Sequence, residues 1–305
     1  MAGDPISGQC WLRQSLSKVR QALVELGYGI CCETLRRLLC QHNIRPKSNV
    51  KRLAPKPHPD RDQQFRHIQS QRELFQRLAW PIISVDTKKK ELIGPFHNRG
   101  RVWCEQAQAV YTHDFPSDAR GKAVPYGVYD VQHNDAHVYV GQSADTPEFA
   151  VAAIVQWWQM IGRHRYPDAT DMLILADSGG SNSARSRLWK QQLQTQLTDI
   201  FGIAVTVCHY PTGASKWNPI EHRLFSQISH SWAGVPLTSF HHVLEGIRRT
   251  KTNTGLTVGA TLVCKQYETG IKVSQQEMDT LALERHTICP QWNYCITPRK
   301  MGCNL

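Results

Sequence analysis

Three carboxylates, Asp86, Asp177 and Glu221, occupy positions at which the sequence predicts chemistry. Asp86 ends a predicted strand at 82–86, and Asp177 directly follows an unbroken apolar run at 172–176 that predicts a buried strand. Glu221 lies in the first turn of a helix that Asn218 and Pro219 open. Ligands of open α/β sheets collect beyond the carboxyl ends of the strands. The three acids are therefore candidates for one shared site.

Such a cluster of acids repels itself unless a hard cation neutralises it. Mg²⁺ binds a few carboxylates together with waters and substrate phosphate oxygens, and Mn²⁺ is a possible substitute. Two such ions about 4 Å apart activate the attacking oxygen and stabilise the leaving oxygen in phosphodiester chemistry. The acids therefore predict a two-metal site for Mg²⁺ or Mn²⁺.

Each acid also has an ordinary structural interpretation. Asp86 terminates a strand, Asp177 opens the turn before the next helix, and Glu221 completes a capping box begun by Asn218. Taken singly, these interpretations are favoured. Taken together, at these positions in a basic chain, the metal site is favoured.

The charge of the chain indicates a polyanionic partner. Its 305 residues include 36 Lys and Arg against 25 Asp and Glu, which gives a net charge of +11. A hydrophobic fraction of 41% excludes global disorder, and no apolar run approaches the ~18 residues of a membrane span. The ten cysteines form no C-x-x-C pair, and the N-terminus has no apolar leader. We expect a soluble, cytoplasmic, nucleoid-associated protein that binds no membrane.

The predicted elements from residue 60 onward alternate between strands and helices. A strand at 82–86 is followed by a hairpin at 126–141, then by helix, strand 172–176, helix, strand 203–208 and helix. This order is that of the ribonuclease-H-like fold, an α/β mixed sheet with flanking helices. We expect this catalytic domain at 60–235, with a C-terminal extension of unassigned role at 236–305.

The N-terminal region predicts a small all-α domain at 1–42. Two amphipathic runs flank Gly27-Tyr28-Gly29, and the second would expose Arg36 and Arg37. This pattern is typical of a helix-turn-helix DNA reader and equally of an ordinary helical hairpin. A proline-rich basic linker follows at 43–59, and it would either track a phosphate backbone or act as a solvated spacer.

Nine basic residues are candidates for DNA contact. They belong to the second N-terminal helix, the linker, the lysine run after Asp86 and the segment before Glu221, and they are Arg36, Arg37, Lys47, Lys51, Arg52, Lys56, Lys88, Lys89 and Lys216. A run such as 88–90 is also typical of a solvated face.

Five segments give the sequence a specific resemblance. VDTKKKELIGPFHNRGR (85–101), HDF (113–115), GKAVPYGVYD (121–130), LILADSGGSNS (173–183) and CHYPTGASKWNPIEHRLFSQIS (208–229) resemble the ISAzo-type, or Rhodopirellula-type, insertion-sequence transposases of the DDE superfamily. The resemblance covers about residues 58–298. It implies that Asp86, Asp177 and Glu221 match the first, second and third acids of that family.

The resemblance also implies an activity and partners. These are metal-dependent nicking of element ends to a 3′-hydroxyl, attack of that hydroxyl on target DNA, and a homo-oligomer in the active complex. Family members carry more DNA-binding sequence upstream, so an N-terminally truncated copy with impaired end recognition is one expectation. Two alternatives stay open: an inactive DNA-binding remnant or repressor derived from a transposase, and a structure-selective nuclease of the same fold.

Overall fold

The computed structural model describes residues 2–3, 10–11, 14–46 and 58–299, in two compact units that divide after Pro55. The N-terminal unit contains strands β1 (Ala2–Gly3) and β2 (Cys10–Trp11) and helices α1 (Leu16–Glu25) and α2 (Cys32–Gln41). The Ser15 hydroxyl caps α1 by accepting from the backbone N–H of Lys18, and Gly27 turns the chain at a φ of +88°. The two predicted helices are confirmed, whereas their assignment to DNA reading stays a prediction.

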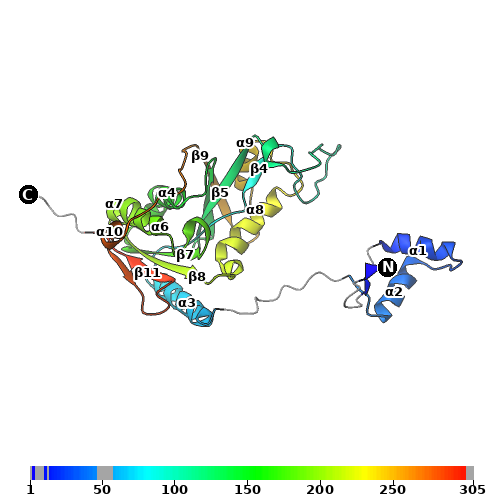
Figure 1. The fold of residues 1–305 in the computed structure, drawn as a ribbon, viewed down its shortest axis with the longest axis horizontal. Helices are drawn as coiled ribbons and strands as arrows, with labels where there is room; N and C mark the ends of the chain where they lie inside the picture. The colour runs from blue at the N-terminus through cyan, green and yellow to red at the C-terminus, as the bar shows by residue number, and fades with distance from the viewer. Residues whose placement is uncertain (1, 4–9, 12–13, 47–57, 300–305) are drawn as a thin grey trace, which may run out of the picture. The chain divides into compact units, whose positions relative to one another are not determined.

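The C-terminal unit is built on one mixed sheet (Figure 1). Its strands, in spatial order, are β10 (Leu283–Arg285), β11 (Asn293–Ile296), β8 (Ala204–Tyr210), β7 (Asp171–Asp177), β3 (Ile82–Thr87), β5 (Gly121–Asp130), β6 (Asp135–Gly141) and β9 (Thr257–Val263), and β4 (Glu91–Ile93) pairs with β5. β7 runs parallel to β3 and β8, whereas β5 is antiparallel to β3 and β6. Numbered along the chain, the central five strands therefore have the spatial order 3-2-1-4-5. The predicted ribonuclease-H-like mixed sheet is confirmed.

Helices cover both faces of this sheet (Figure 1). The α-helices are α3 (Arg61–Arg77), α4 (Pro147–Trp157), α5 (Arg163–Arg165), α6 (Arg187–Gln192), α7 (Asp199–Phe201), α8 (Ser226–Ser231), α9 (Phe240–Arg248) and α10 (Gln275–Asp279). π-helical turns at Trp158–Gly162, Leu193–Thr198 and Glu221–Phe225, and 3₁₀ turns at Pro116–Asp118, Gly180–Asn182 and Ser215–Trp217, extend or connect them.

Strand alternation separates the two cores. Ile83 and Val85 of β3 pack with α4 and α6 on one face, whereas Ile82 packs with α3 on the other. The Thr146 hydroxyl caps α4 by accepting from the backbone N–H of Phe149, and Pro147 follows at the first helical position. Each central strand is buried on both faces, which explains the continuous apolar run in β7.

The structure differs from the sequence prediction in the C-terminal segment. Residues 236–305, expected as an extension, contribute α9, β9, α10, β10 and β11, and β9 and β11 hydrogen-bond directly to β6 and β8. The segment is thus part of the same compact unit. Val102 and Trp103 lie outside any strand, and the Trp103 side chain is fully exposed.

No helix in the described part of the chain is long and apolar enough to cross a membrane.

Candidate active site

Asp86, Asp177 and Glu221 line one pocket of about 430 Å³. Asp86 is the residue before the last in β3, and Asp177 ends β7. Glu221 begins the π-helical turn that leads into α8. The structure thus brings the three candidate acids together from positions 91 and 44 residues apart in the chain.

The register of the sheet explains why Asp86 and Asp177 meet. The parallel pairing of β3 with β7 joins Ser84 to Leu175 and Val85 to Ala176, so the next step places Asp86 beside Asp177. Neighbouring strands lie about 4.8 Å apart. Asp177 also shares its face with Leu175, two residues earlier, which packs on the α3 side of the sheet. Two carboxylates therefore emerge side by side at the carboxyl end of the sheet.

Burial and mutual repulsion make these acids reluctant to ionise. Burial, followed by the charges of Asp177, Glu221 and Asp145, raises the pKa of Asp86 to about 8, although the backbone N–H of Thr87 donates to it at 2.7 Å. Burial likewise raises the pKa of Asp177, and burial and the charge of Asp177 raise that of Glu221. Carboxylates that are held close together repel one another, and a bound cation would reduce this repulsion.

The donor chemistry of the pocket fits a hard divalent cation. Carboxylate oxygens are the protein ligands that Mg²⁺ takes, one or two at a time, with water and phosphate oxygens completing its octahedral shell. No group of three or more His, Cys, Asp or Glu side chains in the described residues closes tightly enough to hold a metal ion alone. The pocket therefore offers part of a coordination shell, and further oxygen ligands would complete it.

Asp145 is a fourth acid at this pocket that the sequence interpretation missed as a site residue. It lies just before α4, accepts a hydrogen bond from the Thr87 hydroxyl at 3.0 Å, and pairs with the Lys90 ammonium at 3.2 Å. In the sequence it is the residue before the Thr146 cap of α4, and nothing local assigns it to a site. Only the tertiary contact between the start of α4 and the end of β3 shows that Asp145 lies at the site.

A larger groove of about 1070 Å³ adjoins the acids and shares Glu221 and the lysine run with their pocket. Of the predicted DNA contacts, Lys89 and Lys216 line it with exposed side chains. Arg99 and the imidazoles of His97 and His222 also line it, and the sequence interpretation had missed these three. Basic side chains therefore line much of the groove, and the adjoining pocket contains the acids.

Lys88, which was also predicted to contact DNA, has partners within the chain. Its ammonium is buried, donates to Glu91 at 2.7 Å, and lies 4.6 Å from the centroid of the Trp232 ring. A cation that is paired and packed on an aromatic ring is already neutralised. Lys88 thus has contacts within the chain, and its contact with phosphate stays a prediction.

The N-terminal candidates for DNA contact stay predictions. Arg36 and Arg37 are exposed on α2, and the Arg36 guanidinium pairs with Glu33 one turn earlier. The linker candidates Lys47, Lys51, Arg52 and Lys56 lie outside the described residues.

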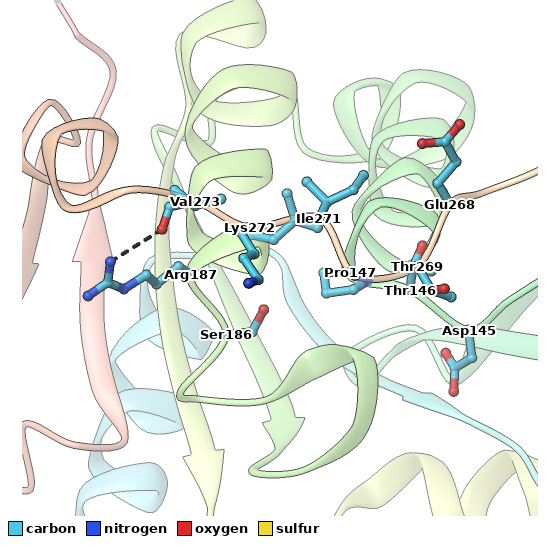
Figure 2. A pocket seen from close by; sticks show the side chains of 12 residues that line it. Asp145, Thr146, Pro147, Ser186, Arg187, Glu268, Thr269, Ile271, Lys272 and Val273 are labelled. Carbon is cyan, nitrogen blue, oxygen red and sulfur yellow. Dashed lines mark hydrogen bonds between the residues drawn. The ribbon is translucent and has the colours of Figure 1, made fainter.

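A further pocket of about 500 Å³ shares Asp145 with the pocket of the acids (Figure 2). Residues 268–273 form one wall, and the starts of α4 and α6 form the others. The Arg187 guanidinium fixes one end of that wall by donating to the Val273 carbonyl at 3.2 Å. Its lining mixes two acids with two bases, Asp145 and Glu268 with Arg187 and Lys272, so its charge favours no ligand class.

Solved structures similar to this chain include two of the Mos1 transposase. One, a "Mos1 transposase paired-end complex with left transposon end", has 12% identity and a TM-score of 0.44 over 81% of this chain and 78% of that chain. Another, the "Mos1 mariner paired end complex with Mn", has 14% identity and a TM-score of 0.42 over 79% and 72%. None of the curated proteins matches the sequence.

A ribonuclease-H-like sheet with acids gathered at the carboxyl ends of its central strands defines a class of proteins that act on nucleic acids. Within that class, the family described as the Rhodopirellula transposase DDE domain matches residues 1–298. The chain belongs to this transposase family, which confirms the resemblance inferred from its motifs.

Proposed function

We propose that this protein cleaves DNA strands at the ends of an insertion element and transfers them into target DNA, with Asp86, Asp177 and Glu221 as its catalytic carboxylates. The observation that carries the proposal is the meeting of these three acids at one pocket of a transposase-family chain. Mg²⁺ is the proposed cofactor and Mn²⁺ its substitute, because the donor set is entirely oxygen.

The proposed reaction has two phosphodiester steps. Water first attacks a phosphorus at the element end, the P–O3′ bond breaks, and the strand is left with a free 3′-hydroxyl. That hydroxyl then attacks a target phosphorus, a new P–O3′ bond forms, and the target strand leaves with its own 3′-hydroxyl. Bound divalent cations supply activation of the attacking oxygen and charge stabilisation of the leaving oxygen. The carboxylates bind and orient the cations.

The basic groove gives the substrate a place beside the acids. Lys89, Arg99 and Lys216 would neutralise phosphates of a strand that enters the acidic pocket, which would otherwise repel it. We propose double-stranded element ends and target DNA as the partners, bound by a homo-oligomer that holds two ends at once.

The variant Asp177→Asn tests this function. The amide is nearly isosteric but uncharged, so we expect strand cleavage in Mg²⁺ to fall by more than about 100-fold, through loss of several kcal/mol of transition-state stabilisation. DNA affinity should stay equal or rise, because repulsion of phosphate falls. Cleavage and joining are measured on labelled duplexes that carry an element end.

Asp171→Asn is the matched control, since Asp171 begins the same strand β7 at the end opposite the pocket. It should cleave like the parent protein. Undiminished cleavage by Asp177→Asn would end the proposal. Cleavage without joining by the parent protein would identify a nuclease, and DNA binding that ignores Mg²⁺ would identify an inactive remnant.

A further inference from the structure

A buried polar pair ties the strand of Asp86 to the helical segment of Glu221. The Ser84 hydroxyl donates to Asn218 Oδ1 at 2.5 Å and accepts from the backbone N–H of Ile220 at 3.1 Å. Asn218 Nδ2 in turn donates to the Val85 carbonyl at 3.4 Å. Ser84 and Asn218 are both fully buried, although 134 residues separate them in the chain. We call this pair the Ser84–Asn218 clamp.

The Ser84–Asn218 clamp joins the same two segments that carry Asp86 and Glu221, at positions deeper in the protein. Ser84 precedes Asp86 by two residues on β3, so both side chains lie on the same face of the sheet. Asn218 precedes Glu221 by three residues, and the backbone N–H of Glu221 donates to the Asn218 carbonyl at 3.1 Å. Side chains three residues apart lie above one another in a turn closed by such a bond. The contact of Ser84 with Asn218 therefore fixes which residue faces Asp86.

A shift of the helical segment by one residue would break this correspondence. It would turn the Glu221 carboxylate by about 100° around the helix axis and move it about 1.5 Å along that axis. It would also leave the Asn218 amide and the Ile220 N–H buried without partners, which destabilises such a register. The clamp thus penalises every register except the one that brings Glu221 to Asp86.

We propose that Ser84 and Asn218 are positioning residues that set the separation of the Asp86 and Glu221 carboxylates for a shared divalent cation. The proposal rests on the function proposed above. Neither residue lines the acidic pocket, so each acts only through the acids. Loss of groups that orient metal ligands typically weakens metal binding by 10–100-fold.

The test is direct binding of Mn²⁺ to the full-length protein, followed by the electron paramagnetic resonance signal of free Mn²⁺. We expect Ser84→Ala and Asn218→Ala each to weaken Mn²⁺ binding by about tenfold or more. The double variant should be no weaker than the worse single variant, because both residues act as one unit. If Ser84→Ala does not fold, Ser84→Cys replaces it in the Mn²⁺-binding test, because the thiol fills a similar volume but is only a weak hydrogen-bond donor.

Thr206→Val is the matched control, since it removes one buried hydroxyl, which donates to Asp171 at 2.9 Å at the far end of β7 and β8. It should lower the melting temperature as the clamp variants do and leave Mn²⁺ binding unchanged. Clamp variants that bind Mn²⁺ like the control at equal loss of melting temperature would overturn the proposal. Equal Mn²⁺ binding by the parent protein and Asp177→Asn would instead overturn the proposed metal site, and the clamp with it.

Discussion

At the scale of single residues, the site is built at the expense of stability. Asp86 has a pKa of about 8, raised from 3.8 by burial and by three neighbouring acids, so the fold resists its ionised form. Hydrogen bonds from the backbone N–H groups of Thr87 and Ser178 hold Asp86 and Asp177 in place but do not cancel this penalty. A cation that binds the folded state alone would recover it.

Asp86→Asn should therefore stabilise the cation-free protein. Because the pKa of Asp86 is higher in the folded than in the unfolded chain, its contribution to stability is full below pH 3.8 and is lost as pH rises through about 8. The variant does not titrate, so its advantage in melting temperature should grow from pH 5 to pH 8, by about 2–4 °C for each kcal/mol. Thermal unfolding in EDTA across this range measures the difference. An advantage that is flat with pH would show that Asp86 ionises freely.

At the scale of elements, the close approach of the Glu221 helical segment to the sheet depends on Gly127. Gly127 pairs with Asp86 across β3 and β5, and a Cβ there would lie 2.8 Å from side-chain atoms of Ile220 and Phe225 and 3.1 Å from Leu224. The side-chain-free position lets the segment lie close to the sheet, within reach of the pocket. Gly127 and the Ser84–Asn218 clamp thus control two different coordinates, the distance and the register.

Gly127→Ala should push that segment away from the sheet. We expect a loss of about 1–3 kcal/mol in the free energy of unfolding, as for other overpacked sites, together with reduced strand cleavage. Urea denaturation and the cleavage assay measure the two effects. Gly121→Ala on the same strand is the control, because its nearest atom, in the Phe240 ring, is 3.3 Å away and remote from the acids. Equal stability and activity in the two variants would refute this role of Gly127.

The sequence predicted those elements whose signals are local. The apolar run before Asp177 predicted a buried strand, and the structure contains that strand as β7. Strand β9 escaped prediction because Gly259 and Ala260 weaken its apolar pattern, and its partner β6 lies more than 100 residues earlier. The contacts of Asp145 with Thr87 and of Lys88 with Trp232 were not predicted for the same reason, because they follow from packing between distant segments.

At the scale of the whole molecule, positive charge is concentrated in the first 55 residues. This segment holds nine Lys and Arg against three Asp and Glu, which gives +6 of the total of +11. The unit that includes α1 and α2 is therefore the more basic for its length, whereas the C-terminal unit contains Asp86, Asp177 and Glu221. This division favours DNA capture by the N-terminal unit and chemistry by the C-terminal one.

Sequence reading by α2 and general attraction to DNA can be separated by substitution. If α2 reads element ends, the double variant Arg36→Ala/Arg37→Ala should lose its preference for an end over random duplex, because side chains that contact bases carry the sequence information. Replacing Lys47, Lys51, Arg52 and Lys56 with Ala should weaken binding to both duplexes alike. Each phosphate contact so removed should flatten the log–log salt dependence by about one unit, since fewer counterions are released.

The measurement is binding of each variant to both duplexes across a salt series, with folding checked by the melting temperature. Glu33→Ala is an informative control, because it frees Arg36 from its ion pair without removing a cation. It should keep the preference and raise affinity for both duplexes. If the linker variant loses discrimination while the α2 variant keeps it, end recognition lies outside α2, and the N-terminal helices are an ordinary hairpin.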